Sequence, residues 1–257
     1  VGTLFNCMMT LLFFPFLNQI ASAIEWLIPH KRERVGGDQL YSLSLLEGKH
    51  GAVPMTALTI ARHKMSQMSN RTVKMAASLE SYFNGDDKEK SREDVFQGEA
   101  ELDQSLREMS KMATDLLGEP LSLQDINEVK TLLKMSEEYE SVSDYLAQIL
   151  KLYLRLEAAG LSLEPAQNKE MMELFQHTYE LLLSAAEIEL QEDAREYLPK
   201  METKGKAITA YVRKSRDAHW KRLAEGSMHP LASTVYSDLL NAYRKIKNHL
   251  FSAVQAQ

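Results

Sequence analysis

Six long segments, separated by short turn and cap signals, constrain the fold of this chain more than any other feature. They cover residues 54–83, 93–117, 122–159, 165–190, 194–224 and 230–254. In the third segment apolar residues recur at the period of a helix with one buried face. Its apolar stripe consists of Ile126, Val129, Leu132, Leu146, Ile149, Tyr153 and Leu156. No segment shows the strict alternation of a half-buried strand, so the predicted fold class is all-α.

The ends of these segments carry recognisable helix signals. Ser122 and Asp125 have the spacing of a capping box and open the third helix. Gly160 ends that helix and Gly226 ends the fifth. Pro199 lies inside the fifth segment, where it predicts a kink or a restart. Long helices with short links favour antiparallel neighbours, and we expect two groups of three helices that divide near Gly160.

The N-terminal 29 residues differ from the rest of the chain. Residues 4–24 are predominantly apolar and about as long as a helix that crosses a bilayer. They include Asn6, Asn18 and Pro15, which in lipid usually face neighbouring helices. A basic cluster at 31–34 follows and predicts that this side is cytoplasmic. We therefore expect a C-terminal membrane helix at 1–29, a cytoplasmic linker at 30–53 and a helical domain at 54–257.

Two other interpretations of the apolar segment are open. A signal peptide cleaved after Ala21-Ser22-Ala23 would lack a basic start, and its basic cluster lies on the wrong side. A buried helix of a soluble protein is disfavoured because the segment is apolar all round. The chain opens on Val1 and carries no charged residue before Glu25, so we also expect further sequence upstream.

Composition excludes several classes of function. The net charge of −6 argues against nucleic-acid binding, which needs a basic face. The single cysteine, Cys7, permits neither an internal disulfide nor a cysteine-based zinc site. The sequence contains no Gly-rich phosphate loop, no GxSxG elbow and no HExxH motif. Its seven histidines are scattered, and solvated helix faces are expected for most of them. We therefore predict that the chain is not an enzyme.

Two acidic pairs are the candidate binding residues. Glu99 and Asp103 lie four residues apart in one predicted helix, and Glu140 and Asp144 lie four apart in the next. This spacing places both carboxylates of a pair on one helix face. If the two pairs face each other, a cation is needed to balance their charge, and carboxylate oxygens suit hard metals. A solvated acidic face is the simpler alternative, because other acidic pairs with this spacing occur in the chain.

The chain also resembles a known family. The residues TLFN at 3–6, with the apolar run that contains FPF at 14–16, resemble the last membrane helix of bacterial sodium/phosphate cotransporter family proteins. Residues 54–257 resemble the cytoplasmic PhoU-like domain that follows this helix in those proteins. The resemblance implies two tandem three-helix bundles with a regulatory role in phosphate transport. It also implies the bacterial cell membrane as the location, with residues 30–257 in the cytoplasm.

The resemblance gives the acidic pairs a specific role. PhoU-like bundles carry an E-x-x-x-D motif on one helix and an E-R-I-x-D-type motif on the next. Glu99 and Asp103 match the first, and Glu140 and Asp144 match the second without its Arg and Ile. Together they are expected to bind a divalent or trivalent metal ion.

The second half of the chain departs from this pattern. The corresponding positions are Glu202 with Lys206, and Arg244 with Asn248. A lysine or arginine beside a metal ion carries a large electrostatic cost. We therefore expect metal in the first bundle only.

The resemblance also implies binding partners, and other functions remain as alternatives to it. The expected partners are an upstream transmembrane bundle of the same protein, the membrane, and a cytoplasmic regulatory protein or a second copy of the chain. A single-anchor helical signalling or adaptor protein that regulates phosphate uptake is the main alternative. A di-iron enzyme needs two Glu-x-x-His motifs on facing helices, and the only one here, Glu47–His50, lies in the linker.

Overall fold

The computed structural model describes residues 53–189, 197–226 and 229–256, and these parts form six helices. They are α4 (Val53–Asn84), α5 (Lys88–Leu117), α6 (Leu123–Ala158), α7 (Pro165–Glu189), α8 (Leu198–Ala224) and α9 (Pro230–Ala256). The described residues contain no strand, so the all-α prediction is confirmed. All six helices lie within one compact unit, Lys49–Gln257.

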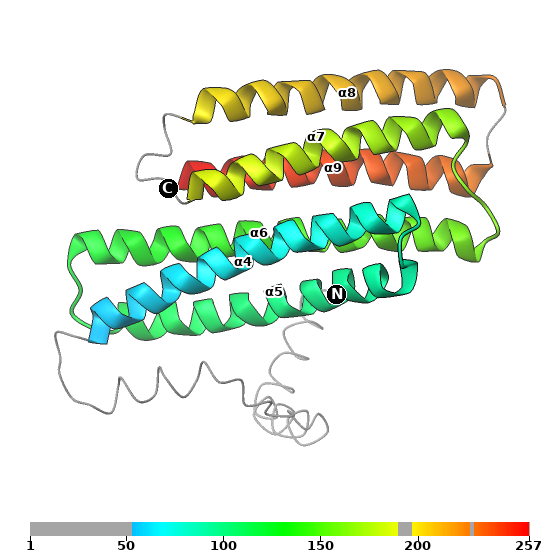
Figure 1. Cartoon of the computed structure of the whole chain (residues 1–257). Helices are drawn as coiled ribbons and strands as arrows, with labels where there is room; N and C mark the ends of the chain where they lie inside the picture. Colours follow the sequence, from blue (N-terminus) through cyan, green and yellow to red (C-terminus); the bar gives the residue numbers. More distant parts are fainter. Residues whose placement is uncertain (1–52, 190–196, 227–228, 257) are drawn as a thin grey trace, which may run out of the picture. The chain divides into compact units, whose positions relative to one another are not determined.

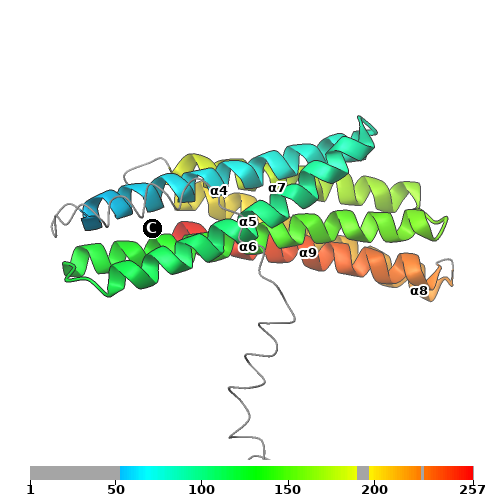
Figure 2. The same ribbon diagram turned by 90° about the horizontal axis from the view of Figure 1, so that it is seen from below.

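The helices pack as two groups of three (Figure 1). In the first bundle α4, α5 and α6 contact one another, and in the second α7, α8 and α9 do so. The bundles meet mainly along α6 and α9, and α4 also contacts α7; Figure 2 shows this arrangement from below. The chain passes between the bundles at Gly160, which has a positive φ of 66° that favours glycine. This is the division expected from the sequence.

Side-chain caps fix the starts of α5 and α6. The predicted capping box opens α6: Asp125 N donates to Ser122 Oγ at 3.1 Å, and Ser122 N donates to Asp125 Oδ2 at 3.3 Å. Helix α5 begins before the predicted residue 93 because Asp87 accepts a hydrogen bond from the first-turn amide of Lys90. Helix α8 begins at Leu198, so Pro199 lies in its first turn, where a proline is tolerated. The stretch 190–196 lies outside the described residues.

The contact between the two bundles combines apolar packing with one buried charge. The predicted stripe on α6 is buried at Val129, Leu132, Leu146, Ile149 and Leu156. The Glu138 side chain on α6 is only 7% exposed, and its carboxylate lies 2.7 Å from His249 Nδ1 on α9 and 2.6 Å from Lys134 Nζ. A buried charge of this kind needs partners, and it has them on both sides of the contact.

Gly98 allows a close approach of α5 to α4. A Cβ at this position would lie 2.4 Å from Met75 Cγ, and Met75 is fully buried. Overpacking costs about 1–3 kcal/mol, and the better helix propensity of alanine returns up to about 1 kcal/mol. We therefore expect Gly98→Ala to lower the free energy of unfolding by about 1 kcal/mol, as measured by urea denaturation.

Gly205 on α8 provides the matched control for this prediction. A Cβ there would lie 2.4 Å from Phe251 Cε2, but Phe251 is only half-buried and its ring can turn toward solvent. Gly205→Ala should therefore lower the free energy of unfolding by less than Gly98→Ala does. Equal losses in the two variants would contradict the argument from burial.

No helix in the described part of the chain is long and apolar enough to cross a bilayer. The expected membrane helix at 1–29 lies outside the described residues. So does the expected linker at 30–53, except for Val53, which begins α4.

Candidate metal centre

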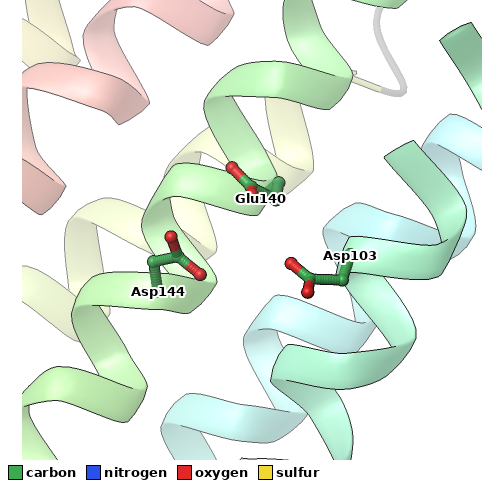
Figure 3. Close-up of side chains that lie close together, drawn as sticks. All are labelled: Asp103, Glu140 and Asp144. Carbon is green, nitrogen blue, oxygen red and sulfur yellow. The ribbon is translucent and has the colours of Figure 1, made fainter. Parts of the chain in front are cut away.

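Three carboxylates converge between α5 and α6. Asp103 projects from α5 toward Glu140 and Asp144 of α6 (Figure 3). One oxygen from each residue lies within 4.8 Å of the others. Asp103 and Glu140 are half-buried and Asp144 is exposed, so the site is open to solvent on one side. We refer to these three residues as the carboxylate triad.

Glu99, the fourth predicted ligand, has a different partner. Its carboxylate lies 2.7 Å from Lys151 Nζ of α6 and forms an ion pair. Lys151 follows Asp144 by two helical turns and therefore lies on the same face of α6. Sequence reasoning missed this lysine, although its spacing from Asp144 was visible. The structure thus brings together three of the four predicted residues, and Glu99 neutralises a neighbouring cation.

The carboxylate triad is electrostatically unfavourable without a cation. Desolvation between the two helices raises the pKa of Glu140, and the charges of Asp144 and Asp103 raise it further. Desolvation likewise raises the pKa of Asp144, with contributions from Glu99 and Asp103 that Lys151 partly offsets. Both shifts mean that the ionised carboxylates are less stable here than in water. The Arg107 guanidinium lies 3.8 Å from the Asp103 carboxylate on the same helix.

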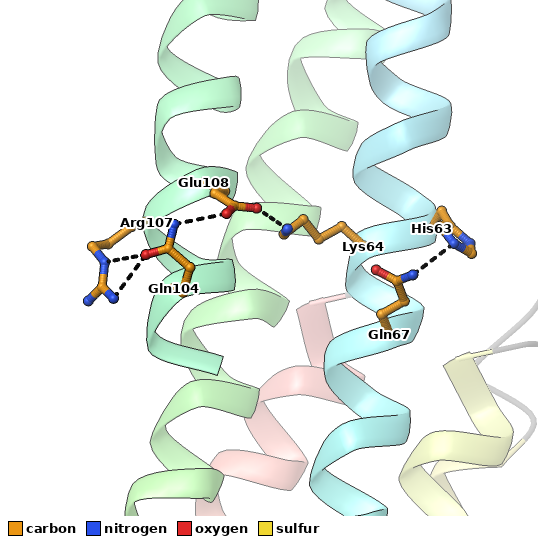
Figure 4. A network of polar contacts seen from close by, with 6 residues as sticks. All are labelled: His63, Lys64, Gln67, Gln104, Arg107 and Glu108. Carbon is orange, nitrogen blue, oxygen red and sulfur yellow. Dashed lines mark hydrogen bonds and ion pairs between the residues drawn. The ribbon is translucent and has the colours of Figure 1, made fainter. Parts of the chain in front are cut away.

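Glu108, farther along α5, is a partly buried carboxylate whose charge is balanced by neighbouring groups, unlike the carboxylates of the triad. It pairs with Lys64 of α4 and accepts a hydrogen bond of 2.9 Å from Gln104, whose own oxygen accepts from Arg107 (Figure 4). Partial burial alone would raise the pKa of Glu108, but the hydrogen bonds from Lys64 and Gln104 lower it below its ordinary value. Glu108 therefore needs no metal ion, whereas the carboxylate triad lacks equivalent cations.

The spacing of the carboxylate triad fits a hard cation. Calcium binds oxygen at 2.3–2.6 Å, so two ligands on opposite sides of the ion lie about 4.6–5.2 Å apart. The three oxygens lie within 4.8 Å of one another, so a single ion of this size can contact all three. Magnesium dehydrates reluctantly and usually keeps several waters, so calcium suits a site built from three carboxylates better. Three carboxylates do not fill the coordination shell, which leaves positions for water.

The raised pKa values lead to a prediction about pH. Because Glu140 and Asp144 bind protons at higher pH in the folded chain than in the unfolded chain, stability falls as pH rises through their folded-state pKa values. The destabilisation caused by the ionised forms of these two carboxylates is fully present at neutral pH and disappears on acidification. We expect the cation-free chain to regain a few tenths of a kcal/mol from these groups as the pH falls from about 7 to about 4, near their ordinary pKa values; the gain is small because solvent screens the site.

Thermal unfolding at both pH values measures this gain. The variant Glu140→Gln/Asp144→Asn should lack it, while all other titrating groups contribute equally to both proteins. A variant whose pH dependence matches that of the wild type would show that the two carboxylates do not repel each other.

The first bundle, which contains the triad, also matches a known protein family. Residues 65–153 match the model of the PhoU domain. The matched range runs from α4 to α6 and contains the carboxylate triad and Glu99. No curated protein matches the chain. A PhoU domain is therefore present in the first bundle.

Proposed function

We propose that this chain is a non-catalytic regulatory module of a phosphate-transport system, and that a hard cation bound by the carboxylate triad is part of its control. The observation that carries the proposal is the coincidence of the PhoU domain match with the helices that hold the triad. PhoU domains are associated with the regulation of phosphate transport, and the triad gives this one a place to bind an ion.

The role of each residue follows from its position. Asp103 supplies oxygen from α5, and Glu140 and Asp144 supply oxygen from α6. A bound cation neutralises their repulsion and links the two helices, while an empty site leaves the carboxylates pushing α5 and α6 apart. The packing of the first bundle thereby depends on the ion. Glu99 pairs with Lys151, whose charge also acts on the neighbouring Asp144 of the triad.

The more specific proposal places the module at the end of a sodium-dependent phosphate cotransporter of the bacterial cell membrane. Residues 1–29 then form its last membrane helix, and residues 30–257 lie in the cytoplasm. The coding sequence upstream of Val1 tests this: several further membrane helices with internal repeat symmetry support it. A short upstream sequence without them would favour the single-anchor adaptor instead.

Uptake measurements test the regulatory role. Cells that carry the intact gene and cells that carry Asp103→Asn/Asp144→Asn should differ in how phosphate uptake responds to external phosphate. The variant Asp94→Asn/Asp115→Asn removes two charges from α5 outside the triad and serves as the control. If all three strains take up phosphate identically, the triad has no regulatory role.

A further inference from the structure

The second bundle has an open hollow that is lined in part by polar side chains. It lies between α8 and α9, as the triad lies between α5 and α6, and has a volume of about 390 Å³. Its polar lining includes Lys206, Thr209, Lys247, Asn248, Ser252 and Gln255. We call it the α8–α9 hollow. Since a water molecule takes up about 30 Å³ of liquid, a tetrahedral anion with several waters fits inside.

Lys247 is the charged group that distinguishes this hollow. It is half-buried, and its Nζ donates to Thr209 Oγ1 at 3.2 Å. Among the described residues no carboxylate lies within ion-pair distance of this ammonium group. Burial and the neighbouring Arg244 guanidinium lower the pKa of Lys247, which shows that its positive charge is not compensated. A partly desolvated cation of this kind favours an anionic ligand.

The second lysine, Lys206, is only weakly engaged. Its Nζ lies 3.3 Å from Glu202 Oε2, and the two side chains are 80% and 59% exposed. Such a surface pair contributes little and opens readily, so Lys206 is free to turn toward a ligand. The Glu202 carboxylate also lines the hollow and opposes an anion, but two lysines outweigh it.

The two bundles therefore carry sites of opposite charge. Where the first has Asp103, Glu140 and Asp144, the second has Lys206, Arg244 and Asn248 at the corresponding sequence positions. A metal ion between α8 and α9 would face ammonium groups, which is costly. Two ammonium groups and side-chain amides are instead hydrogen-bond donors for an oxyanion.

We propose that the α8–α9 hollow binds a phosphate group, with Lys247 and Lys206 as its charge partners and the Asn248 amide as a neutral donor, while Thr209, whose hydroxyl donates to Gly205 O, positions Lys247. The same chemistry would accept free inorganic phosphate or a phosphate monoester. The choice of phosphate among oxyanions rests on the proposed function, whereas the preference for an anion rests on the lining residues alone. The chain would then bind a cation in one bundle and phosphate in the other.

Calorimetric titration of the whole chain with inorganic phosphate, at constant ionic strength, tests the proposal. We expect saturable binding that is tighter for phosphate than for sulfate. Glycerol phosphate, titrated in parallel, shows whether the site takes free phosphate or a monoester: the tighter ligand identifies the source. No saturable binding of any phosphate compound, or equal binding of sulfate, overturns the proposal.

Variants locate the site. Lys247→Gln should weaken phosphate binding by about tenfold or more, because charge-assisted hydrogen bonds are among the stronger ones. Lys247→Arg should retain most of the binding, and Glu202→Gln should strengthen it. Lys200→Gln removes an exposed lysine of α8 outside the hollow and should change nothing. Unchanged affinity in a folded Lys247→Gln protein contradicts the assignment.

Cation binding is measured on the same preparations. The Lys247 variants should bind cations as the wild type does, because the triad lies in the other bundle. Loss of phosphate binding with retained cation binding confirms that the two sites are separate. A chain that binds cations but no phosphate would overturn this inference and leave the proposed function standing.

Discussion

Replacing Asp103 and Asp144 together by asparagine is expected to lower the affinity of the chain for a calcium-like cation on the order of a hundredfold or more. Both residues are ligands in the proposed site, one from each helix. Their loss removes two of three charges, and the affinity of oxygen sites for hard cations depends strongly on ligand charge. Calorimetric titration of the whole chain with calcium, lanthanum and magnesium measures the effect. Calcium and lanthanum should bind more tightly than magnesium, because magnesium loses its bound waters reluctantly.

The same variant should lose the stabilisation that the cation provides. A ligand at one hundred times its Kd stabilises the folded state by about 2.7 kcal/mol. For a domain of this size, that corresponds to a rise in Tm of roughly 5–10 °C. Without the cation the variant should be slightly more stable than the wild type, because the repulsion within the triad is gone. This opposite behaviour with and without the ion separates a ligand role from a purely structural one.

The variant Asp94→Asn/Asp115→Asn removes the same net charge from α5 and serves as the control. Neither residue belongs to the triad, so cation affinity should change little. If both double variants lose affinity equally, the cation is held by the general negative charge of the bundle. The carboxylate triad would then be an ordinary solvated acidic face.

The fold was predictable because its determinants are local. The capping box at Ser122, the positive-φ glycine at 160 and the periodic apolar stripe of α6 each act within a few residues of their own position. Helix ends were less predictable where one side chain decides them. Asp87 caps the start of α5, but it belongs to a polar segment whose composition predicts a turn.

The candidate site was only partly predictable because it depends on how helices rotate against each other. The four-residue spacing identified the acidic pairs, but only packing shows that Glu99 faces Lys151 while Asp103 faces Glu140. Burial of single polar residues was not predictable either. His219 is only 2% exposed and lies against Tyr236, so it is an exception to the solvated helix faces expected for most histidines.

Glu170 joins all three helices of the second bundle, and its replacement by alanine is expected to be strongly destabilising. From α7 its carboxylate lies 2.6 Å from Arg222 Nη2 of α8 and accepts a hydrogen bond from the Tyr236 hydroxyl of α9. The side chains of Arg222 and Glu170 are 16% and 22% exposed. Water can therefore replace few of the hydrogen bonds that Arg222 and Tyr236 lose when the carboxylate is removed. Burial and the neighbouring Glu170 both raise the pKa of Tyr236, which keeps its hydroxyl protonated as a donor.

We expect Glu170→Ala to lower the free energy of unfolding by about 2–4 kcal/mol, slightly below the cost of breaking a fully buried pair. Glu170→Gln keeps the shape and one acceptor and should cost about half as much, because only the charge is lost. Urea denaturation followed by circular dichroism measures both. Glu180→Ala removes an exposed glutamate from the same helix and should stay within about 0.5 kcal/mol of the wild type. A loss for Glu170→Ala no larger than this would mean that apolar packing alone holds α7, α8 and α9 together, and that the charged contact at the end of the bundle contributes nothing.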